Sequence, residues 1–275
     1  MRYLDFHFHC SVDTPEAVAE TVRTAKENNT VVALIGGLRY GGHDFVPNEQ
    51  VLEICRKEPE WLVPLAKFDL WKTADADQVY RYKEAGFKAV KFIYPYYAYD
   101  HDLYMPVYAA CEECGLPVLF HTGNYSPNES DVKYQLPTLK NMHPINLDRI
   151  ARSFPKLHVV MAHLGTTLFR ELAAGLVRML PNLCFDLAGN GAWSGVSPQQ
   201  LGELMKPFPA SFRGDDDFRY FHQMVFGSDS YVHYPQLLPM AKAAYEEKLR
   251  LNNVPQDIQE GIMGKTVADW IGFDL

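Results

Sequence analysis

Two histidines near the start of the chain, His7 and His9, have the types and the spacing of metal ligands. They lie in the segment Asp5-Phe6-His7-Phe8-His9, whose alternation of polar and apolar residues predicts a β-strand. Successive side chains of a strand point to opposite faces, so Asp5, His7 and His9 are expected to share one face. Two imidazoles placed in this way can bind one divalent cation. On its own the motif is weak, since a His-x-His at a strand end usually has no functional role.

Later apolar segments also stop at side chains that bind cations or transfer protons. Four such segments end in a residue of this kind or carry one near their end: Lys91, His121, His163 and Asp229. Chance rarely places a potential ligand at the end of several strands, so the recurrence indicates a metal site. Neutral imidazoles would supply affinity and a carboxylate would offset the charge of the cation. This donor set suits a divalent metal, and we expect zinc.

The same residue types suggest how such a site would act on a substrate. A catalytic metal site leaves one coordination position for water and lowers the pKa of that water to about 7. Asp229 is suited to bind the cation and to accept the proton of the water as general base. His163 would orient the water or polarise the carbonyl of the substrate.

The elements that would position these residues alternate between short apolar strands and amphipathic helices. Strands are expected over residues 3–9, 31–35, 62–67, 89–93, 117–121, 158–163, 183–187 and 224–229. Helices are expected over residues 15–28, 75–85, 105–114, 146–154, 168–180 and 234–249, with two short helices closing the chain. Eight such repeats predict an α/β fold of the (β/α)8 TIM barrel type, in which catalytic residues lie at the carboxyl ends of the strands. The alternative, an open doubly wound sheet, lacks its glycine-rich phosphate loop here.

Composition narrows the classes of function. The 275 residues are expected to form one domain, 1–275, and the net charge of −8 argues against a nucleic-acid partner. No apolar run is long enough to span a membrane, and we expect no cleaved secretory signal, because the chain lacks a basic region followed by an apolar stretch near its start. The five cysteines are scattered and odd in number, which predicts reduced thiols and a cytoplasmic location. The expected partner is a small-molecule substrate, and a homo-oligomer is compatible with the sequence.

The motifs, taken in order, resemble those of the amidohydrolase superfamily, in its amidohydrolase-related branch of metal-dependent hydrolases and decarboxylases. Beside the Asp-x-His-x-His opening they are GFKAVKF (86–92), GLPVLFHTGN (115–124), FPKLHVVMAHLG (154–165), LPNLCFDLAG (180–189), FGSDS (226–230) and IMGKTVADWIGF (262–273). The resemblance implies a barrel with one metal ion. It also implies His7, His9, His121 and Asp229 as the ligands, and His163 as a catalytic or second-metal residue.

Two positions depart from the pattern of the decarboxylases in this branch. These often have a glutamate directly after the His-x-Gly of the sixth strand and a Tyr-Pro after the aspartate of the eighth. The chain has Thr166 and Ser230-Tyr231 at these places. The departures favour a hydrolase of a lactone, amide or ester. A non-oxidative decarboxylase or hydratase remains the alternative, and a non-catalytic metal-binding protein is a third reading.

Lys91 is expected to point inward at the mouth of the barrel, where a buried ammonium group needs a partner. We expect it to bind substrate or a neighbouring carboxylate; the alternative is a carboxylated lysine that bridges two metals, as in some relatives. Three segments are expected to shape the pocket: residues 124–142, residues 189–199 and the aromatic run Tyr94-Pro95-Tyr96-Tyr97. They favour a planar or ring-shaped substrate.

Overall fold

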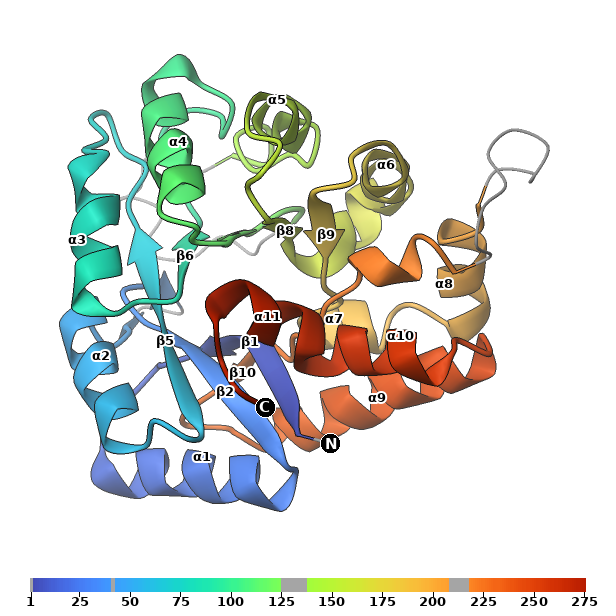
Figure 1. Ribbon diagram of the computed structural model, residues 1–275, viewed down its shortest axis with the longest axis horizontal. Coiled ribbons are helices and arrows are strands. Elements are labelled where there is room, and N and C mark those ends of the chain that lie inside the picture. Colours follow the sequence, from blue (N-terminus) through green and yellow to red (C-terminus); the bar gives the residue numbers. More distant parts are fainter. Residues whose placement is uncertain (1, 41–42, 125–137, 208–217) are drawn as a thin grey trace.

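A parallel sheet of eight strands forms the centre of the computed structural model, which describes residues 2–40, 43–124, 138–207 and 218–275 (Figure 1). Its order is β10-β1-β2-β5-β6-β7-β8-β9, so nearly every strand pairs with the strand before it in the chain. The strands are β1 (Tyr3–His9), β2 (Thr30–Ile35), β5 (Leu62–Phe68), β6 (Ala89–Phe92), β7 (Val118–Phe120), β8 (Val159–Met161), β9 (Leu183–Phe185) and β10 (Ser230–Tyr231).

The sheet closes on itself through residues 224–229, between β9 and β1. Met224 forms a parallel bridge with Phe185, and the Val225 amide donates to the Phe185 carbonyl at 2.9 Å. On the other side, the Phe6 amide donates to the Phe226 carbonyl at 3.0 Å. The (β/α)8 barrel expected from the sequence is therefore confirmed.

The expected eighth strand, residues 224–229, is wrong in its bounds, because regular pairing begins only at Ser230. Two residues explain the irregular backbone. Asp229 has a φ of 61°, which no strand residue adopts. A side chain at Gly227 would place its Cβ 2.9 Å from Cβ of His7, so the chain passes β1 too closely for a normal strand. His121 and His163 likewise lie just beyond the ends of β7 and β8.

Helices surround the sheet in Figure 1 and return the chain from each strand to the next. They are α1 (Pro15–Glu27), α2 (Asn48–Lys57), α3 (Asp77–Ala85), α4 (Met105–Glu113), α5 (Asn146–Ser153), α6 (Thr166–Met179), α7 (Asn190–Trp193), α8 (Pro198–Leu204), α9 (Leu237–Leu251), α10 (Gln256–Glu260) and α11 (Thr266–Ile271). Two of these helices have well-defined ends. Thr14 caps α1 by accepting from the Ala17 amide, and Gly86 ends α3 with a φ of 107°. The short hairpin of β3 (Arg39–Tyr40) and β4 (His43–Asp44), with helix α2 after it, was not anticipated.

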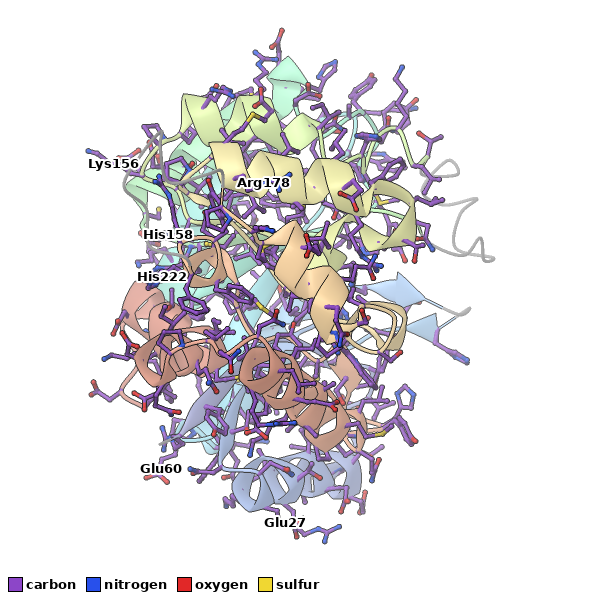
Figure 2. All side chains as sticks on the ribbon, turned by 90° about the vertical axis from the view of Figure 1, so that its right-hand side faces the viewer. Glu27, Glu60, Lys156, His158, Arg178 and His222 are labelled. Atoms are coloured by element: carbon purple, nitrogen blue, oxygen red, sulfur yellow. The ribbon has the colours of Figure 1, made fainter. Side chains whose placement is uncertain are left out.

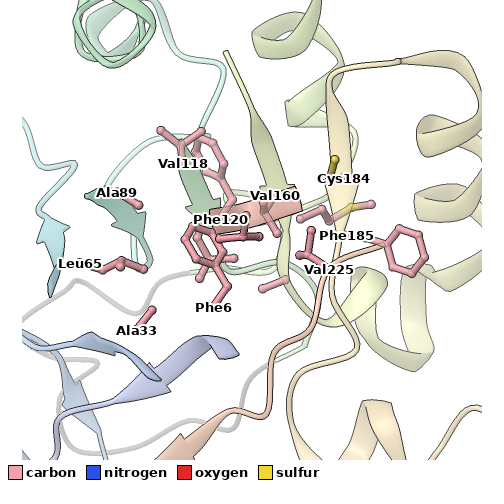
Figure 3. Packing of buried hydrophobic residues seen from close by; sticks show 14 of the residues in the cluster. Phe6, Ala33, Leu65, Ala89, Val118, Phe120, Val160, Cys184, Phe185 and Val225 are labelled. Atoms are coloured by element: carbon pink, nitrogen blue, oxygen red, sulfur yellow. The ribbon is translucent and has the colours of Figure 1, made fainter. Parts of the chain in front are cut away.

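Apolar side chains from every part of the sheet form the core (Figure 3). Phe6, Ala33, Leu65 and Ala89, from β1, β2, β5 and β6, are fully buried. Charged side chains such as Glu27, Glu60 and Lys156 lie instead on the exposed outer surface (Figure 2). Within the described residues, no helix is both long and apolar enough to cross a membrane.

Candidate active site

A cavity of about 260 Å³ lies where the strands reach their carboxyl ends. Its polar lining includes His9, Lys91, His121, His163 and Asp229, which the sequence analysis singled out, together with threonines and an asparagine; His7 lies behind this lining. Its apolar walls come from Phe45, Tyr94 and Tyr231. The residues that line it are His9, Leu38, Phe45, Lys91, Ile93, Tyr94, His121, Asn124, His163, Thr166, Thr167, Ala188, Gly189, Gly191, Ala192, Asp229 and Tyr231.

Three of the four expected metal ligands meet at the base of this cavity. Oδ1 of Asp229 lies 2.9 Å from Nε2 of His9 and 3.4 Å from Nε2 of His7. The three side chains offer ligand atoms that all lie within 4.8 Å of one another. A tetrahedral cation with bonds of about 2.1 Å holds its ligand atoms roughly 3.4 Å apart, so the spacing fits one cation.

Asp186 sets which nitrogen of His7 carries the proton. Its Oδ2 lies 2.9 Å from Nδ1 of His7, and a carboxylate only accepts, so we assign the proton to Nδ1. Nε2 of His7 then presents a lone pair toward Asp229, as a metal ligand requires. The other oxygen of Asp186 accepts from the backbone amides of His163 and Ala188, at 2.7 and 2.9 Å. Asp186 thus fixes both the His7 ring and the loop that carries His163.

The fourth expected ligand, His121, is joined to His163. The Ala188 carbonyl can only accept, so Nδ1 of His163, 2.8 Å away, must donate to it. Nε2 of a neutral His163 therefore accepts from Nδ1 of His121, at 3.0 Å. This leaves the lone pair of His121 on Nε2, a buried atom without a hydrogen-bond partner among the described residues. A buried acceptor left unpaired on a ligand-type side chain fits a bound cation.

The backbone is strained at the two residues expected to be catalytic. His163 has a φ of 66° and Asp229 a φ of 61°, in the left-handed region that residues other than glycine rarely adopt. Such outliers gather at functional sites because the surrounding structure holds them there. The Asp229 amide donates to the His7 carbonyl at 2.8 Å. Gly189 leaves room for both side chains, since a Cβ there would lie 3.0 Å from Oδ2 of Asp229 and 3.6 Å from Nδ1 of His163.

Burial and neighbouring charges set the protonation of the site. Burial lowers the pKa of His7, His9 and His121, which favours the neutral imidazoles that bind cations. Burial by itself would raise the pKa of Asp229, but attraction to His7 and His9 in their protonated forms and the hydrogen bond with Nε2 of His9 outweigh it, so that this pKa lies below its ordinary value. Asp229 is therefore ionised at neutral pH.

Lys91 is fully buried on β6, and its partner differs from the expected carboxylate. Its Nζ lies 3.0 Å from Nε2 of His7. Burial lowers the pKa of Lys91 to about 8, against the attraction of Asp186 and Asp229. The lone pair of His7 cannot serve both Lys91 and a cation. A metal on His7 would therefore leave Nζ of Lys91 free to face the cavity, which it already lines.

Asp186 is the main residue that the sequence analysis missed. It follows β9 directly, in the quoted motif LCFDLAG, and so carries the same signal as the other sites: an apolar strand that stops at a ligand-type side chain. Asp5, whose shared face with His7 was predicted, supports the eighth strand instead. Its carboxylate accepts from the Ser228 hydroxyl at 2.5 Å and the Ser228 amide at 3.0 Å.

The segments expected to shape the pocket contribute unequally. From residues 189–199, Gly189, Gly191 and Ala192 line the cavity. From residues 124–142 Asn124 does so, while residues 125–137 lie outside the described part of the chain. Of the expected aromatic run only Tyr94 lines the cavity. Tyr231 adds a wall that was not anticipated, stacked on His9 with ring centres 5.5 Å apart.

Comparison with protein families finds one match, to a model described as amidohydrolase, over residues 41–273. Comparison with curated protein sequences finds none.

Solved structures share the fold at low sequence identity. An uncharacterised TIM-barrel protein from Bordetella bronchiseptica matches with a TM-score of 0.70 and 17% identity, over 99% of this chain and 100% of that one. A probable 2-pyrone-4,6-dicarboxylic acid hydrolase from Acinetobacter baumannii has a TM-score of 0.60, 14% identity and coverage of 99% and 100%. A dihydroxybenzoic acid decarboxylase from Polaromonas, with bound manganese and an inhibitor, has a TM-score of 0.59, 11% identity and coverage of 98% and 97%.

Proposed function

Since the amidohydrolase model matches most of its length, this chain belongs to the amidohydrolase family, and we propose that it is a metal-dependent hydrolase of a small-molecule lactone, amide or ester. The observation that carries the proposal is the meeting of His7, His9 and Asp229 at the base of the cavity, with ligand atoms within 4.8 Å of one another. The unpartnered Nε2 of His121 on the lining of the same cavity supports a fourth ligand.

We propose one divalent metal, with zinc as the expected ion, because imidazoles and a single carboxylate form the donor set. Manganese in the similar decarboxylase structure supports a divalent ion in this fold without fixing its identity here. When bound, such an ion polarises a carbonyl and lowers the pKa of a water molecule. Proton transfer and substrate binding are proposed for the residues around the ion.

Asp229 is proposed as the general base. Its Oδ1 faces His7 and His9, whereas no hydrogen bond from the described residues reaches Oδ2. Oδ2 can therefore accept a proton from an attacking water while Oδ1 stays in contact with His7 and His9. Because the pKa of Asp229 is held low, the carboxylate is in the accepting form over the whole neutral range.

His163 is proposed as the proton-handling residue. Its Nδ1 proton is held by the Ala188 carbonyl, so Nε2 is the atom that can take a second proton, and taking it requires release of the hydrogen bond from Nδ1 of His121. From there it can polarise a carbonyl or protonate a leaving group. Lys91 is proposed to contact the substrate, as the one fully buried ammonium group among the described residues that line the cavity.

His163→Ala is expected to keep most of the metal but to lower kcat by about 100-fold or more, as the loss of a proton-handling group does. Metal content by elemental analysis and turnover by steady-state kinetics check this division of labour. His143→Ala, a partly exposed histidine outside the cavity, is the matched control and should change neither. A His163→Ala protein as free of metal as His121→Ala would show that His163 acts as a ligand.

A non-oxidative decarboxylase or hydratase is the second candidate. The observation in its favour is Lys91, a buried cation at the cavity that would hold a substrate carboxylate. Against it, the position of the decarboxylase glutamate is occupied by Thr166, whose hydroxyl accepts from the Asn124 amide at 3.0 Å and so supports a loop. A screen of zinc-loaded protein against lactones, esters, amides and aromatic carboxylic acids separates the candidates by their products. Metal binding without any turnover in that screen would favour the non-catalytic reading.

A further inference from the structure

His121 lies one residue beyond the regular end of β7, where the sheet fixes only its amide. β7 ends at Phe120, and the His121 amide donates to the Phe92 carbonyl of β6 at 2.9 Å, as in a parallel ladder. In a continued ladder the His121 carbonyl would accept from the amide two residues past Phe92, that of Tyr94. Tyr94 has a φ of 57°, and β6 ends at Phe92, so the regular ladder stops here. A donor for the His121 carbonyl must therefore come from another part of the chain.

Tyr99, in the segment between β6 and α4, supplies this donor. Its hydroxyl lies 2.9 Å from the carbonyl oxygen of His121 and 3.3 Å from that of Phe92. A hydroxyl carries one proton, and the shorter distance assigns it chiefly to His121. The side chain is fully buried, and its ring packs edge-on against Phe120 with ring centres 4.8 Å apart. The hydroxyl thus joins the ends of two neighbouring strands at the level of His121.

Backbone contacts on both sides hold Tyr99 itself in place. Its amide donates to the Asn141 carbonyl at 3.2 Å, and its carbonyl accepts from the Tyr108 hydroxyl of α4 at 2.8 Å. Burial raises the pKa of Tyr99 well above its ordinary value, so the hydroxyl keeps its proton throughout the neutral range. Tyr99 is therefore an anchored hydrogen-bond donor to the backbone of His121.

We propose that Tyr99 is a positioning residue of the metal site, which holds the backbone of His121 so that its ring can serve as the fourth ligand. The proposal rests on the ligand role proposed for His121. On the ring itself, Nδ1 donates to His163 at 3.0 Å, which orients the ring but does not fix the backbone that carries it. Metal–ligand distances tolerate deviations of only about 0.2 Å, so a small displacement of the backbone weakens a ligand. Tyr99 does not line the cavity, so it acts through His121 and not through the substrate.

Tyr99→Phe removes only the hydroxyl, and competition between the zinc-loaded chain and a chromophoric chelator measures the effect. The zinc dissociation constant should rise by about tenfold, the usual result of losing a group that orients a metal ligand. Tyr104→Phe is the matched control and should keep the zinc affinity of the native chain. Tyr104 is also fully buried, and its hydroxyl lies 3.0 and 2.9 Å from two backbone carbonyl oxygens, those of Leu70 and Trp71, which lie outside the cavity lining.

The melting temperature and the spectrum of the cobalt-loaded chain separate positioning from general support of the fold. Both variants remove a buried donor from backbone carbonyls, so both should melt at a lower temperature than the native chain. Only Tyr99→Phe should change the visible absorption of the cobalt-loaded chain, which depends on the geometry of the ligands around the ion. The rise in melting temperature on adding zinc should also be smaller in Tyr99→Phe, and this comparison remains valid in a variant of reduced stability.

Two results would overturn the role of Tyr99. One is a Tyr99→Phe protein with the zinc affinity and the cobalt spectrum of the native chain. The other is an equal loss of zinc affinity in Tyr104→Phe, which would assign the effect to the fold. Either result leaves the hydrolase proposal standing if the native chain binds zinc and His121→Ala does not. A native chain that binds no zinc would instead remove the metal site, and both proposals would fail with it.

Discussion

His7→Ala and His121→Ala are each expected to lose the bound metal and all measurable activity together. The native chain should contain about one divalent ion, and each substitution removes one imidazole from its ligand set. Both ring nitrogens of His7 have defined neighbours. Nδ1 is fixed by Asp186, and Nε2 lies 3.4 Å from Oδ1 of Asp229. Elemental analysis of the purified proteins, grown with added zinc, gives the metal content directly, and circular dichroism confirms that the variants fold.

His222→Ala provides the control for this pair, because His222 is exposed and lies outside the cavity lining. It should retain the metal content and the activity of the native chain. A native protein that holds no metal after growth with zinc would contradict the ligand set. Two ions per chain would instead favour a carboxylated Lys91 that bridges them.

Asp229→Asn is expected to lower kcat by about 10³-fold or more while leaving part of the substrate binding intact. The amide cannot accept a proton as a carboxylate does, although its shape is nearly the same. In the native chain the rate should rise with pH to a plateau, with an apparent pKa of about 6–7 for the ionisation of the attacking water and its partner. The sign follows from the attacking water, which is a good nucleophile only when deprotonated, whereas the Asp229 carboxylate is already ionised over this range.

Steady-state kinetics across pH, with metal content measured in the same samples, check the expected effect of Asp229→Asn. Asp257→Asn, at an exposed position in α10, is the matched control and should behave as the native chain does. An Asp229→Asn variant that keeps both its metal and most of its turnover would exclude Asp229 as the base. A variant that loses the metal entirely would show that the ligand role of Asp229 dominates.

The sequence predicted the barrel and most of the site because two simple patterns carry that information. Alternation in the first strand places His7 and His9 on one face, and strands that stop at ligand-type residues place His121, His163 and Asp229 at the same end of the sheet. Asp186 obeys the second pattern as well, and applying the pattern to the seventh strand would have found it.

Other features of the site depend on contacts that no local pattern records. The left-handed conformations of His163 and Asp229 arise from the close packing of loops, including the approach of Gly189. The choice of protonated nitrogen on His7 and His121 depends on partners more than 40 residues away in the chain. The pairing of Lys91 with His7, rather than with a carboxylate, is likewise a tertiary contact. Sequence periodicity indicates which face a side chain occupies, but not its neighbour across the barrel.

Turnover in 18O-labelled water tests the central claim most directly, with a substrate found in the screen and zinc-loaded protein. If the enzyme is a hydrolase, one labelled oxygen appears in the carboxylate of the product, and no carbon dioxide is released. Release of carbon dioxide, with solvent deuterium incorporated at carbon when the reaction runs in heavy water, would instead identify a decarboxylase and contradict the proposed hydrolysis.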